Sequence, residues 1–273
     1  MKVSIIISVY NESKYIRKCL ESLLVQTFKE FEIIVIDDGS TDKSSEILAD
    51  FLKQKKNIQF LKLKHGGPAI ARNLGVDKSK GDILVFLDGD MYFEKDFLQT
   101  LVNPIVSKKA KGTYSTEEYV ANWKNIWARC WNYNWNLKHK KRISLNSSDQ
   151  QKDFRAILKE EFLKVGGFDN TGYTDTWSLA KKLGYKPKPT NAKYYHYNPS
   201  TLKEVYNQAK WIGKRKHKGG LLGKIFLIIK NTPLFSLILG FKKSVLYKEP
   251  CFVLFKIVYD FGYLLGLISL KQY

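Results

Sequence analysis

Short apolar runs alternate with longer segments of helical periodicity along the first ninety residues. Val3–Val9 is a continuous run rich in β-branched residues, which is typical of a strand covered on both faces. Comparable runs predict three further strands, at residues 33–36, 58–63 and 83–87. The segments between them carry apolar residues on one helical face. This alternation predicts an α/β fold with a mostly parallel sheet flanked by helices.

Capping residues set the expected starts of these helices. Ser13 predicts a first helix over about residues 13–25, and Thr41 or Asp42 a second that ends near residue 52. Such side chains accept hydrogen bonds from the free N–H groups of a helix N-terminus. A third helix is expected to begin at Pro68, since proline suits the first helical position.

The pattern changes after residue 110. Aromatic residues recur every four positions from Tyr119 to Trp135 and predict a single stripe along a helix. Such a stripe is more often a face of the core than a ligand platform. Because tryptophan and basic residues occur together there, a membrane interface or an acceptor groove stays open as well. Farther along, the pattern predicts strands at 154–158 and 192–197 and helices at 176–183 and 201–217.

The last fifty residues contain two apolar segments, Leu221–Phe241 and Cys251–Leu270. Each is near the length that spans a bilayer. Lys256 and Asp260 interrupt the second segment, and charges at the centre of a bilayer are costly. We therefore favour interfacial helices over a spanning hairpin, with a buried addition to the core as the alternative. The flanking lysines would favour anionic lipid by about 1 kcal/mol each; they are Lys214, Lys216, Lys218, Lys242, Lys243 and Lys248.

The charge is unevenly distributed. The 273 residues carry a formal net charge of +20, of which residues 1–90 contribute +1 and residues 91–273 contribute +19. A strongly basic region suggests a polyanionic partner, either nucleic acid or an anionic membrane surface. No nucleic-acid-binding motif accompanies it, and the apolar C-terminal segments favour the membrane. We expect no nucleic acid partner.

Three widely spaced cysteines indicate a reducing compartment. Cys19, Cys130 and Cys251 form no C-x-x-C pair, so a disulfide framework or a zinc site is not expected. The apolar run at the N-terminus ends at Asn11 and Glu12, which is too short for the apolar region of a signal peptide.

Pairs of aspartates end two of the predicted strands. Asp88 and Asp90 follow the run at 83–87, and residues two apart in an extended chain point to the same side. Two such carboxylates favour a nearby cation, and Mg²⁺ or Mn²⁺ takes oxygen ligands while keeping positions open for phosphate. Asp37 and Asp38 end the second strand, where an Asp can accept hydrogen bonds from a nucleobase or a ribose. Taken alone, the D-x-D pair more often marks an ordinary polar turn, and the Asp37-Asp38 pair alone is also a weak signal.

Arg72 and Asn73 follow a Gly-Gly-Pro turn at the start of the third helix. An arginine can pair with a diphosphate, and a helix N-terminus favours anions. A surface salt bridge is the alternative for Arg72 alone.

Taken together and in order, these clusters resemble the inverting family 2 glycosyltransferases of the GT-A fold. The resemblance covers roughly residues 1–218 and rests on the segments Ser8–Asn11, Asp37–Asp42, Gly67–Gly75, Leu87–Asp90, Gly166–Asp169 and Thr174-Asp175. It implies a Rossmann-like GT-A sheet. We expect a part that binds the sugar nucleotide at residues 1–110 and an acceptor-binding part at residues 111–218. Apolar, membrane-associating helices are expected at residues 219–273.

The resemblance also implies contacts with the donor nucleotide. Tyr10 would lie beside the nucleobase, which Asp38 would contact with Asp37 close by. Arg72 and Asn73 would contact the nucleotide.

Further matching positions concern the metal ion and the reaction. Asp88 and Asp90 match the D-x-D motif that holds a divalent metal, Mn²⁺ or Mg²⁺, and the sugar nucleotide. Asp175 matches the general base, and an N-cap of the helix that follows it is the alternative. The usual Glu-Asp pair is Thr174-Asp175 here, which leaves the orientation of the acceptor open. His196 is a candidate third metal ligand or diphosphate contact, and a histidine in an aromatic cluster is the alternative.

These expectations define an inverting, metal-dependent glycosyltransferase at the cytoplasmic face of the cell membrane. Its donor would be a UDP-, GDP- or dTDP-sugar, and its acceptor a hydroxyl or phosphate of a lipid-linked or glycan molecule. The alternatives are an inactive scaffold that binds nucleotide sugars on the membrane and a basic nucleic-acid-binding protein.

Overall fold

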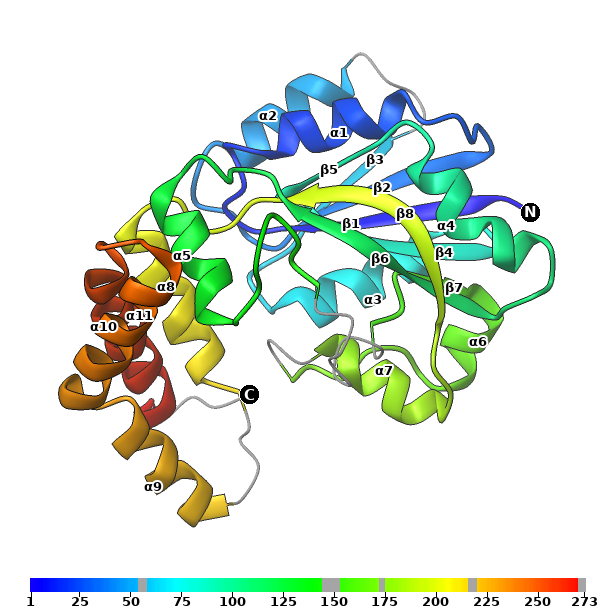
Figure 1. Ribbon diagram of the computed structural model, residues 1–273. Coiled ribbons are helices and arrows are strands. Elements are labelled where there is room, and N and C mark those ends of the chain that lie inside the picture. Colours follow the sequence, from blue (N-terminus) through cyan, green and yellow to red (C-terminus); the bar gives the residue numbers. More distant parts are fainter. Residues whose placement is uncertain (54–57, 144–152, 172–174, 216–219, 270–273) are drawn as a thin grey trace. The chain divides into compact units, whose positions relative to one another are not determined.

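Figure 1 shows the computed structural model, which describes residues 1–53, 58–143, 153–171, 175–215 and 220–269. The chain forms two compact units. Unit 1 comprises residues 1–119, 143–170 and 174–196, and unit 2 comprises residues 120–142, 171–173 and 197–273. Neither unit is one continuous segment, because the chain passes between them several times.

Unit 1 is built on an eight-stranded sheet of order β3-β2-β1-β4-β7-β6-β8-β5. Its parallel half consists of β1 (Val3–Val9), β2 (Phe31–Asp37), β3 (Ile58–Lys62) and β4 (Ile83–Asp88). The four strands expected from the apolar runs are all present, and the α/β fold class is confirmed. The register sets Asp37 opposite Val9 and Asp88 opposite Ser8. The residues that follow three neighbouring strands therefore meet at one edge of the sheet.

Helices cover both faces of this sheet (Figure 1). Ile5 of β1 packs toward α1 (Ile16–Leu24), α2 (Ser44–Leu52) and α4 (Phe97–Val106). Its neighbour Ile6 packs toward α3 (Pro68–Lys78), α6 (Lys159–Lys164) and α7 (Asp175–Leu183). Successive side chains of a strand point to opposite faces, so a run without polar interruption is what a strand covered on both sides requires.

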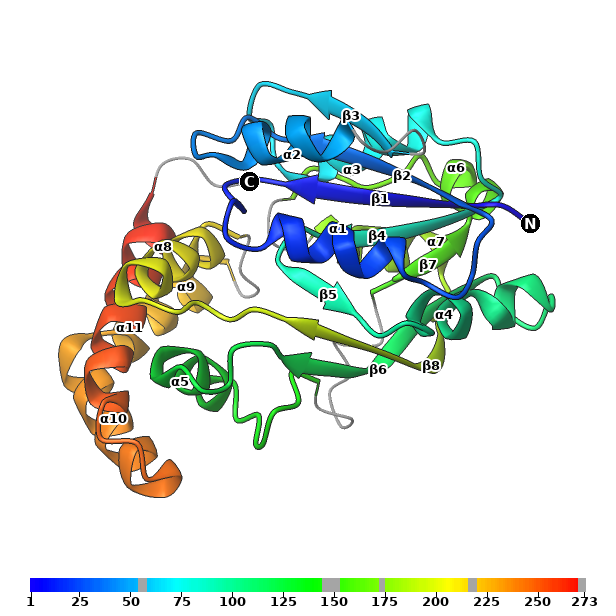
Figure 2. The same cartoon turned by 90° about the horizontal axis from the view of Figure 1, so that it is seen from above.

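The other half of the sheet is antiparallel. It contains β5 (Met91–Phe93), β6 (Gly112–Val120), β7 (Ala156–Leu158) and β8 (Lys188–His196). β7 pairs with β4, and β8 pairs with β5 so that Met91 lies opposite His196. Figure 2 shows β5, β8 and β6 side by side. Of this half, the apolar pattern predicts only β7 and the end of β8.

The first two helices begin later than Ser13 and Thr41 predict. α1 and α2 have Tyr15 and Lys43 at their N-caps, and neither residue caps with its side chain. Asp42 instead links the two helix starts. One of its carboxylate oxygens accepts a hydrogen bond from the Ser44 N–H at 2.9 Å, and the other accepts one from the Ser13 N–H at 3.1 Å. Burial alone would raise the pKa of Asp42, but hydrogen bonds from the side chains and backbone of Ser44 and Ser13 outweigh it and lower that pKa.

Unit 2 is helical. It contains α5 (Ile126–Asn134), α8 (Leu202–Gly213), α9 (Gly220–Lys230), α10 (Pro233–Tyr247) and α11 (Phe252–Ile268). Trp131 of α5, Ile212 of α8 and Phe255 of α11 belong to one buried cluster. The second apolar segment of the sequence is therefore largely core, which is the alternative that the sequence left open.

The predicted aromatic stripe does not lie on one helix. Tyr119 is in β6, Trp123 is in the turn that follows, and α5 begins only at Ile126 because Asn125 caps it. The Asn125 side chain accepts a hydrogen bond from the Ala128 N–H at 3.0 Å. Trp131 is buried, in agreement with a core role for part of the stripe.

Glycines let α8 and α11 pack at close range. A Cβ atom on Gly213 would lie 2.2 Å from the carbonyl oxygen of Tyr263, and one on Gly266 would lie 2.1 Å from that of Lys210. Both distances are far shorter than van der Waals contact, so any side chain at either position would force the two helices apart.

The charged pair in the second apolar segment points into unit 2. Lys256 Nζ lies 2.5 Å from Asp260 Oδ1, and Ser236 Oγ of α10 donates to Asp260 Oδ2 at 2.7 Å. Asp260 is 1% exposed. The two charges therefore neutralise each other inside the protein. They do not face lipid, so the cost of placing a charge in a bilayer does not apply to them.

The remaining apolar segment exposes much of its surface. α10 begins at Pro233, and α9 and α10 are bent by 59° to one another. The apolar face of α9–α10 consists of exposed side chains spaced along both helices: Leu222, Phe226, Ile229, Leu234, Ile238, Phe241 and Val245. Within the described residues, no single helix meets the length and hydropathy of a membrane span, and the bent pair of α9 and α10 meets them together.

Candidate active site

The residues after β2 form a tightly bonded turn. The Asp37 carboxylate accepts hydrogen bonds from the Ser40 N–H at 2.9 Å and from the Ser45 hydroxyl. Asp38 accepts from the N–H groups of Gly66 and Gly67 at 2.8 and 2.9 Å. Asp37 is fully buried and Asp38 is 3% exposed. In this structure both carboxylates therefore hold the turns that shape the end of the sheet.

Tyr10 lies at the same edge and stacks on His65. Their ring centroids are 4.2 Å apart with an interplanar angle of 24°, and Tyr10 is 44% exposed. His65 Nδ1 also lies 2.9 Å from Asp38 Oδ2. An exposed aromatic pair next to the end of a parallel sheet offers a flat apolar surface of the kind on which a nucleobase can stack.

Two guanidinium groups flank Asp88 at the end of β4. Arg72 Nη2 donates to Asp88 Oδ1 at 2.7 Å, and Arg155 Nη1 lies 3.7 Å from Asp88 Oδ2. Burial alone would raise the pKa of Asp88, but Arg72 and Arg155 outweigh it and lower that pKa. Burial would likewise lower the pKa of Arg155, but Tyr194 and Asp88 outweigh it and raise that pKa. The edge therefore carries a fixed anion between two fixed cations.

Asn73, next to Arg72, holds a turn in place. Its amide donates to the Phe168 carbonyl at 2.9 Å and accepts from the Phe168 N–H at 3.0 Å. A Cβ atom on Gly167 would lie 2.7 Å from Asn73 Oδ1, and Gly167 has φ +76°. Only glycine suits such a position. The Gly-Gly-Phe-Asp segment is thereby tied to the helix that carries Arg72.

Asp90 meets His196 from the other half of the sheet. His196 Nε2 lies 3.1 Å from Asp90 Oδ2, and His196 Nδ1 lies 2.8 Å from Glu118 Oε1. The side chains of His196, Asp90 and Glu118 are 16%, 23% and 13% exposed. The imidazole thus lies between two carboxylates, one from β6 and one just after β4.

The Asp90–His196 pair fits two ligands of a divalent metal. A carboxylate oxygen and an imidazole nitrogen are donors that Mn²⁺ accepts. Neighbouring ligands of an octahedral ion at ~2.1 Å lie about 3 Å apart, close to the observed 3.1 Å separation. Among the described residues, no group of three or more His, Cys, Asp or Glu side chains is arranged to hold a metal. Two protein ligands suffice where substrate phosphates complete the shell.

Asp175, the predicted general base, is the first residue of α7, and its side chain lies outside the described part of the structure. Its neighbour Thr174 also lies outside the described residues. α7 packs with Leu179 against the buried cluster that includes Phe168.

Sequence reasoning missed three residues of this edge. They are His65, Glu118 and Arg155, which contact predicted site residues through side chains from distant segments. His65 immediately precedes the recognised Gly-Gly-Pro turn, so a closer reading of that turn could have found it. Glu118 lies in β6 and Arg155 directly precedes the short strand β7, and neither carries a signal of its own.

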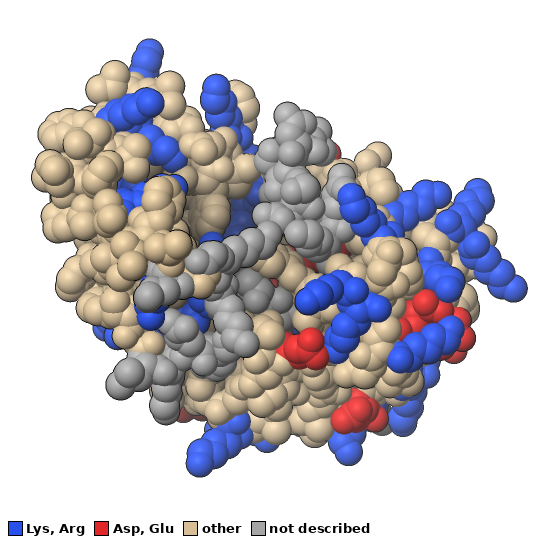
Figure 3. Space-filling view, turned by 90° about the horizontal axis from the view of Figure 1, so that it is seen from below, with Lys and Arg blue, Asp and Glu red and all other residues tan. Residues whose placement is uncertain are grey.

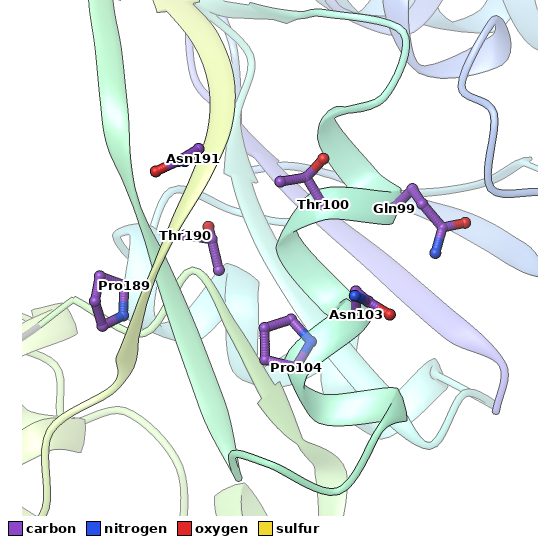
Figure 4. Close-up of a pocket in the computed structure, with 7 residues that line it drawn as sticks. All are labelled: Gln99, Thr100, Asn103, Pro104, Pro189, Thr190 and Asn191. Atoms are coloured by element: carbon purple, nitrogen blue, oxygen red, sulfur yellow. The ribbon is translucent and has the colours of Figure 1, made fainter.

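A separate shallow pocket lies between α4 and β8 (Figure 4). Its lining consists of neutral side chains: Gln99, Thr100, Asn103, Pro104, Pro189, Thr190 and Asn191. None of these can act as an acid, a base or a charged ligand near neutral pH, and none belongs to the site at the end of β4.

Two solved structures with a similar fold contain a bound nucleotide sugar. S. aureus TarS 1-349, in a crystal structure in complex with UDP-GlcNAc, has a TM-score of 0.59 and 18% sequence identity over 98% of this chain and 90% of that one. The mannosyltransferase PcManGT from Pyrobaculum calidifontis, in complex with GDP-Man and Mn²⁺, has a TM-score of 0.59 and 17% identity over 96% of this chain and 73% of that one. These likenesses establish a GT-A-like fold.

Sequence comparison gives the family. The model of "Glycosyl transferase family 2" matches residues 4–166, so the chain belongs to glycosyl transferase family 2. The glycosyltransferase GlyA of Streptococcus pneumoniae serotype 4 is 39% identical over 109 residues, which are 40% of this chain and 16% of that protein. The matched segments span 13% to 41% of the curated relatives. The predicted family and the class of a transferase enzyme are confirmed.

Proposed function

We propose that this protein transfers a sugar from a nucleoside diphosphate donor to an acceptor hydroxyl, with inversion at the anomeric carbon. The observation that carries the proposal is the charged edge at the end of β4. There Asp88 lies between Arg72 and Arg155, and Asp90 meets His196 within 3.1 Å. Carboxylate, guanidinium and imidazole groups placed together at one edge of the sheet suit the binding of a diphosphate and its metal ion.

The chain's own residues would position the donor. Tyr10 offers its exposed ring to the nucleobase, next to the turn that Asp38 holds. Arg72 and Arg155 place positive charge where the leaving diphosphate gains negative charge, and fixed cations stabilise such a transition state. Asp90 and His196 would hold the divalent ion. When bound, that ion supplies further charge neutralisation for the leaving group.

The acceptor step needs one base. Asp175 would take the proton from the attacking hydroxyl, whose oxygen forms the new bond as the bond to the diphosphate breaks. Attack on the side opposite the diphosphate inverts the anomeric centre. Because the diphosphate leaves as a stabilised anion, no second carboxylic acid is required to protonate it.

Two kinds of neighbour support a nucleotide sugar as donor. TarS and PcManGT are complexed with UDP-GlcNAc and with GDP-Man and Mn²⁺ respectively. We propose a UDP-, GDP- or dTDP-sugar here, with Mn²⁺ or Mg²⁺ as the cofactor. The strongly basic composition beyond residue 90 suits a phosphate-bearing acceptor, such as a lipid-linked glycan.

A thermal-shift screen of UDP-, GDP- and dTDP-sugars, each with and without Mn²⁺, tests the donor. We expect one nucleotide to raise the melting temperature, and Mn²⁺ to increase that shift in the wild type but not in Asp90→Asn. Asp77→Asn on the exposed end of α3 is the matched control. Stabilisation without release of nucleoside diphosphate with any acceptor would favour the inactive scaffold. No shift with any nucleotide would contradict the proposal.

For localisation, we propose that the apolar face of α9–α10 binds the cytoplasmic surface of an anionic membrane. Leu222, Leu234 and Val245 are 80%, 66% and 78% exposed, so the face is apolar at both helices. The exposed Lys230, Lys242 and Lys248 lie on the same two helices or at their ends and complement anionic lipid. Figure 3 shows that the surface over the C-terminal helices, at the left, is mostly uncharged with Lys and Arg among it.

Lys243 does not belong to the lipid-facing lysines. Its ammonium donates to the carbonyls of Tyr133 and Asn134 at 2.8 Å each, at the C-terminal end of α5. Burial and the nearby Lys256 together lower the pKa of Lys243 to about 8. This lysine therefore caps α5 inside unit 2.

Vesicle sedimentation tests the membrane proposal. The double variant Ile238→Ser/Phe241→Ser is expected to reduce binding to vesicles of anionic phosphatidylglycerol and neutral phosphatidylcholine at least tenfold, since it removes two exposed apolar anchors. Ile257→Ser/Phe261→Ser, which changes exposed residues of α11, is the matched control and should bind as the wild type. Equal loss in both variants, or undiminished binding in the first, would contradict the assignment.

A further inference from the structure

Glu118 is a carboxylate beside His196 that neither the sequence pattern nor the proposed reaction uses. It extends from β6, and its Oε1 lies 2.8 Å from His196 Nδ1. An ionised carboxylate can only accept hydrogen bonds, so Glu118 accepts the hydrogen that Nδ1 carries when a cation occupies Nε2. The contact thus orients the ring with Nε2 toward Asp90.

The backbone of unit 1 fixes this contact. β6 and β8 are neighbours in the sheet, and side-chain hydrogen bonds tie them together. Thr116 Oγ1 donates to the Thr190 carbonyl at 3.1 Å, and Thr190 Oγ1 donates to the Tyr114 carbonyl at 2.9 Å. Glu118 and His196 therefore sit on two bonded strands, where side chains are placed more precisely than on loops.

The side of the His196 ring that points away from Glu118 faces Asp90. With Nδ1 held by Glu118, Nε2 is the nitrogen that lies 3.1 Å from Asp90 Oδ2. A ring whose outer nitrogen is bonded to a carboxylate keeps a fixed orientation and becomes a more basic ligand at its other nitrogen. The ring of His196 thus links Glu118 on one side to Asp90 on the other.

We propose that Glu118 is a positioning residue that orients His196 as a ligand of the divalent cation. This inference rests on the proposed function, because it assumes that Asp90 and His196 hold the ion. Glu118 itself touches neither the ion nor the donor. Its effect passes through the ring of His196, so removal of Glu118 weakens cation binding before any sugar nucleotide is present.

Binding of Mn²⁺ to the full chain without nucleotide, followed by electron paramagnetic resonance of the free ion, tests the proposal. Glu118→Ala is expected to weaken Mn²⁺ binding about 10- to 100-fold, the usual effect of losing such a partner. Glu118→Gln keeps an oxygen that accepts from Nδ1, so it should restore at least half of the loss on a logarithmic scale. Such a rescue by Glu118→Gln would show that Glu118 acts by orienting the His196 ring and not through its negative charge.

The adjacent residue supplies a matched control. Glu117 accepts a hydrogen bond from the Tyr119 hydroxyl and lies on the opposite face of β6 from Glu118. Glu117→Ala should bind Mn²⁺ as the wild type does. The melting temperature of each variant, measured without metal, separates loss of the ligand geometry from loss of the fold.

Two results separate failure of this inference from failure of the proposed function. If Asp90→Ala and His196→Ala abolish Mn²⁺ binding while folded Glu118→Ala and Glu118→Gln bind normally, Glu118 has no positioning role. If Asp90→Ala and His196→Ala also bind normally, the metal site of the proposed function is wrong.

Discussion

Asp175→Asn is expected to lower the turnover number about 100- to 10,000-fold, because proton removal by a positioned base contributes that much to a transfer reaction. Asparagine has nearly the same shape and volume as aspartate but cannot carry the negative charge of a base. The variant should therefore keep its fold and its affinity for the donor. Steady-state kinetics at saturating donor, together with donor binding by calorimetry, measures both quantities.

The comparison variant for this prediction is Asp77→Asn, an exposed aspartate of α3 outside the site. It should turn over like the wild type. Wild-type turnover in Asp175→Asn would remove this residue from the mechanism and direct attention to another carboxylate. A large rise in the dissociation constant of the donor would instead assign Asp175 to donor binding.

Arg155→Met is expected to have the second largest effect, on both activity and stability. The guanidinium lies 3.7 Å from Asp88, and Nη2 donates to the Tyr194 hydroxyl at 3.2 Å. Its side chain is 16% exposed. Removing one fixed donor of this kind lowers turnover about 100- to 1,000-fold. The unfolding free energy should fall by a few kcal/mol, because Asp88 loses one of its two cations in a largely buried place.

Arg155→Lys separates charge from geometry in the same assay. An ammonium keeps the positive charge near Asp88 but cannot bond Tyr194 and the Phe86 carbonyl as the forked guanidinium does. We expect it to recover most of the stability and only part of the turnover. Full activity in Arg155→Met, measured as kcat/KM for the donor, would show that Arg72 alone provides the cation beside Asp88.

The parallel half of the fold was predictable because each of its strands is marked by a pattern within its own short segment of sequence. A strand buried on both faces needs an uninterrupted apolar run, and β1, β2 and β4 each have one. The polar residues that follow such runs meet at one edge by topology alone. Tyr10, Asp38 and Asp88 could therefore be assigned to one site before any distance was known.

The antiparallel half depends on partners that are distant in sequence. β5 and β7 have three residues each, too few for a period to show. The spacing of Tyr119, Trp123 and Trp127 suggested one helix, although the three residues lie in a strand, a turn and a helix. The four-residue period there is a coincidence, because the chain changes from strand to turn to helix between Tyr119 and Trp127.

The contacts of the site residues depend on the same long-range pairing. Glu118 and His196 are 78 residues apart, and only the adjacency of β6 and β8 brings them together. Asp37, Asp38 and Asn73 were predicted to contact the nucleotide, and their side chains hold turns through hydrogen bonds to neighbouring backbone or hydroxyl groups. A motif marks such positions without telling which of its polar groups face the ligand.

The packing of α11 has a practical consequence for making the protein. Hydropathy suggests trimming the C-terminus at the start of its last apolar segment to improve solubility. That deletion would strip Phe252, Phe255 and Leu267 from the core of unit 2 and uncover the surface of α8 that packs against the glycines of α11. The shortened chain should precipitate more readily than the intact one. Replacing Phe226 and Phe241 by polar residues, with α11 kept, is the better route to a soluble form for crystallisation.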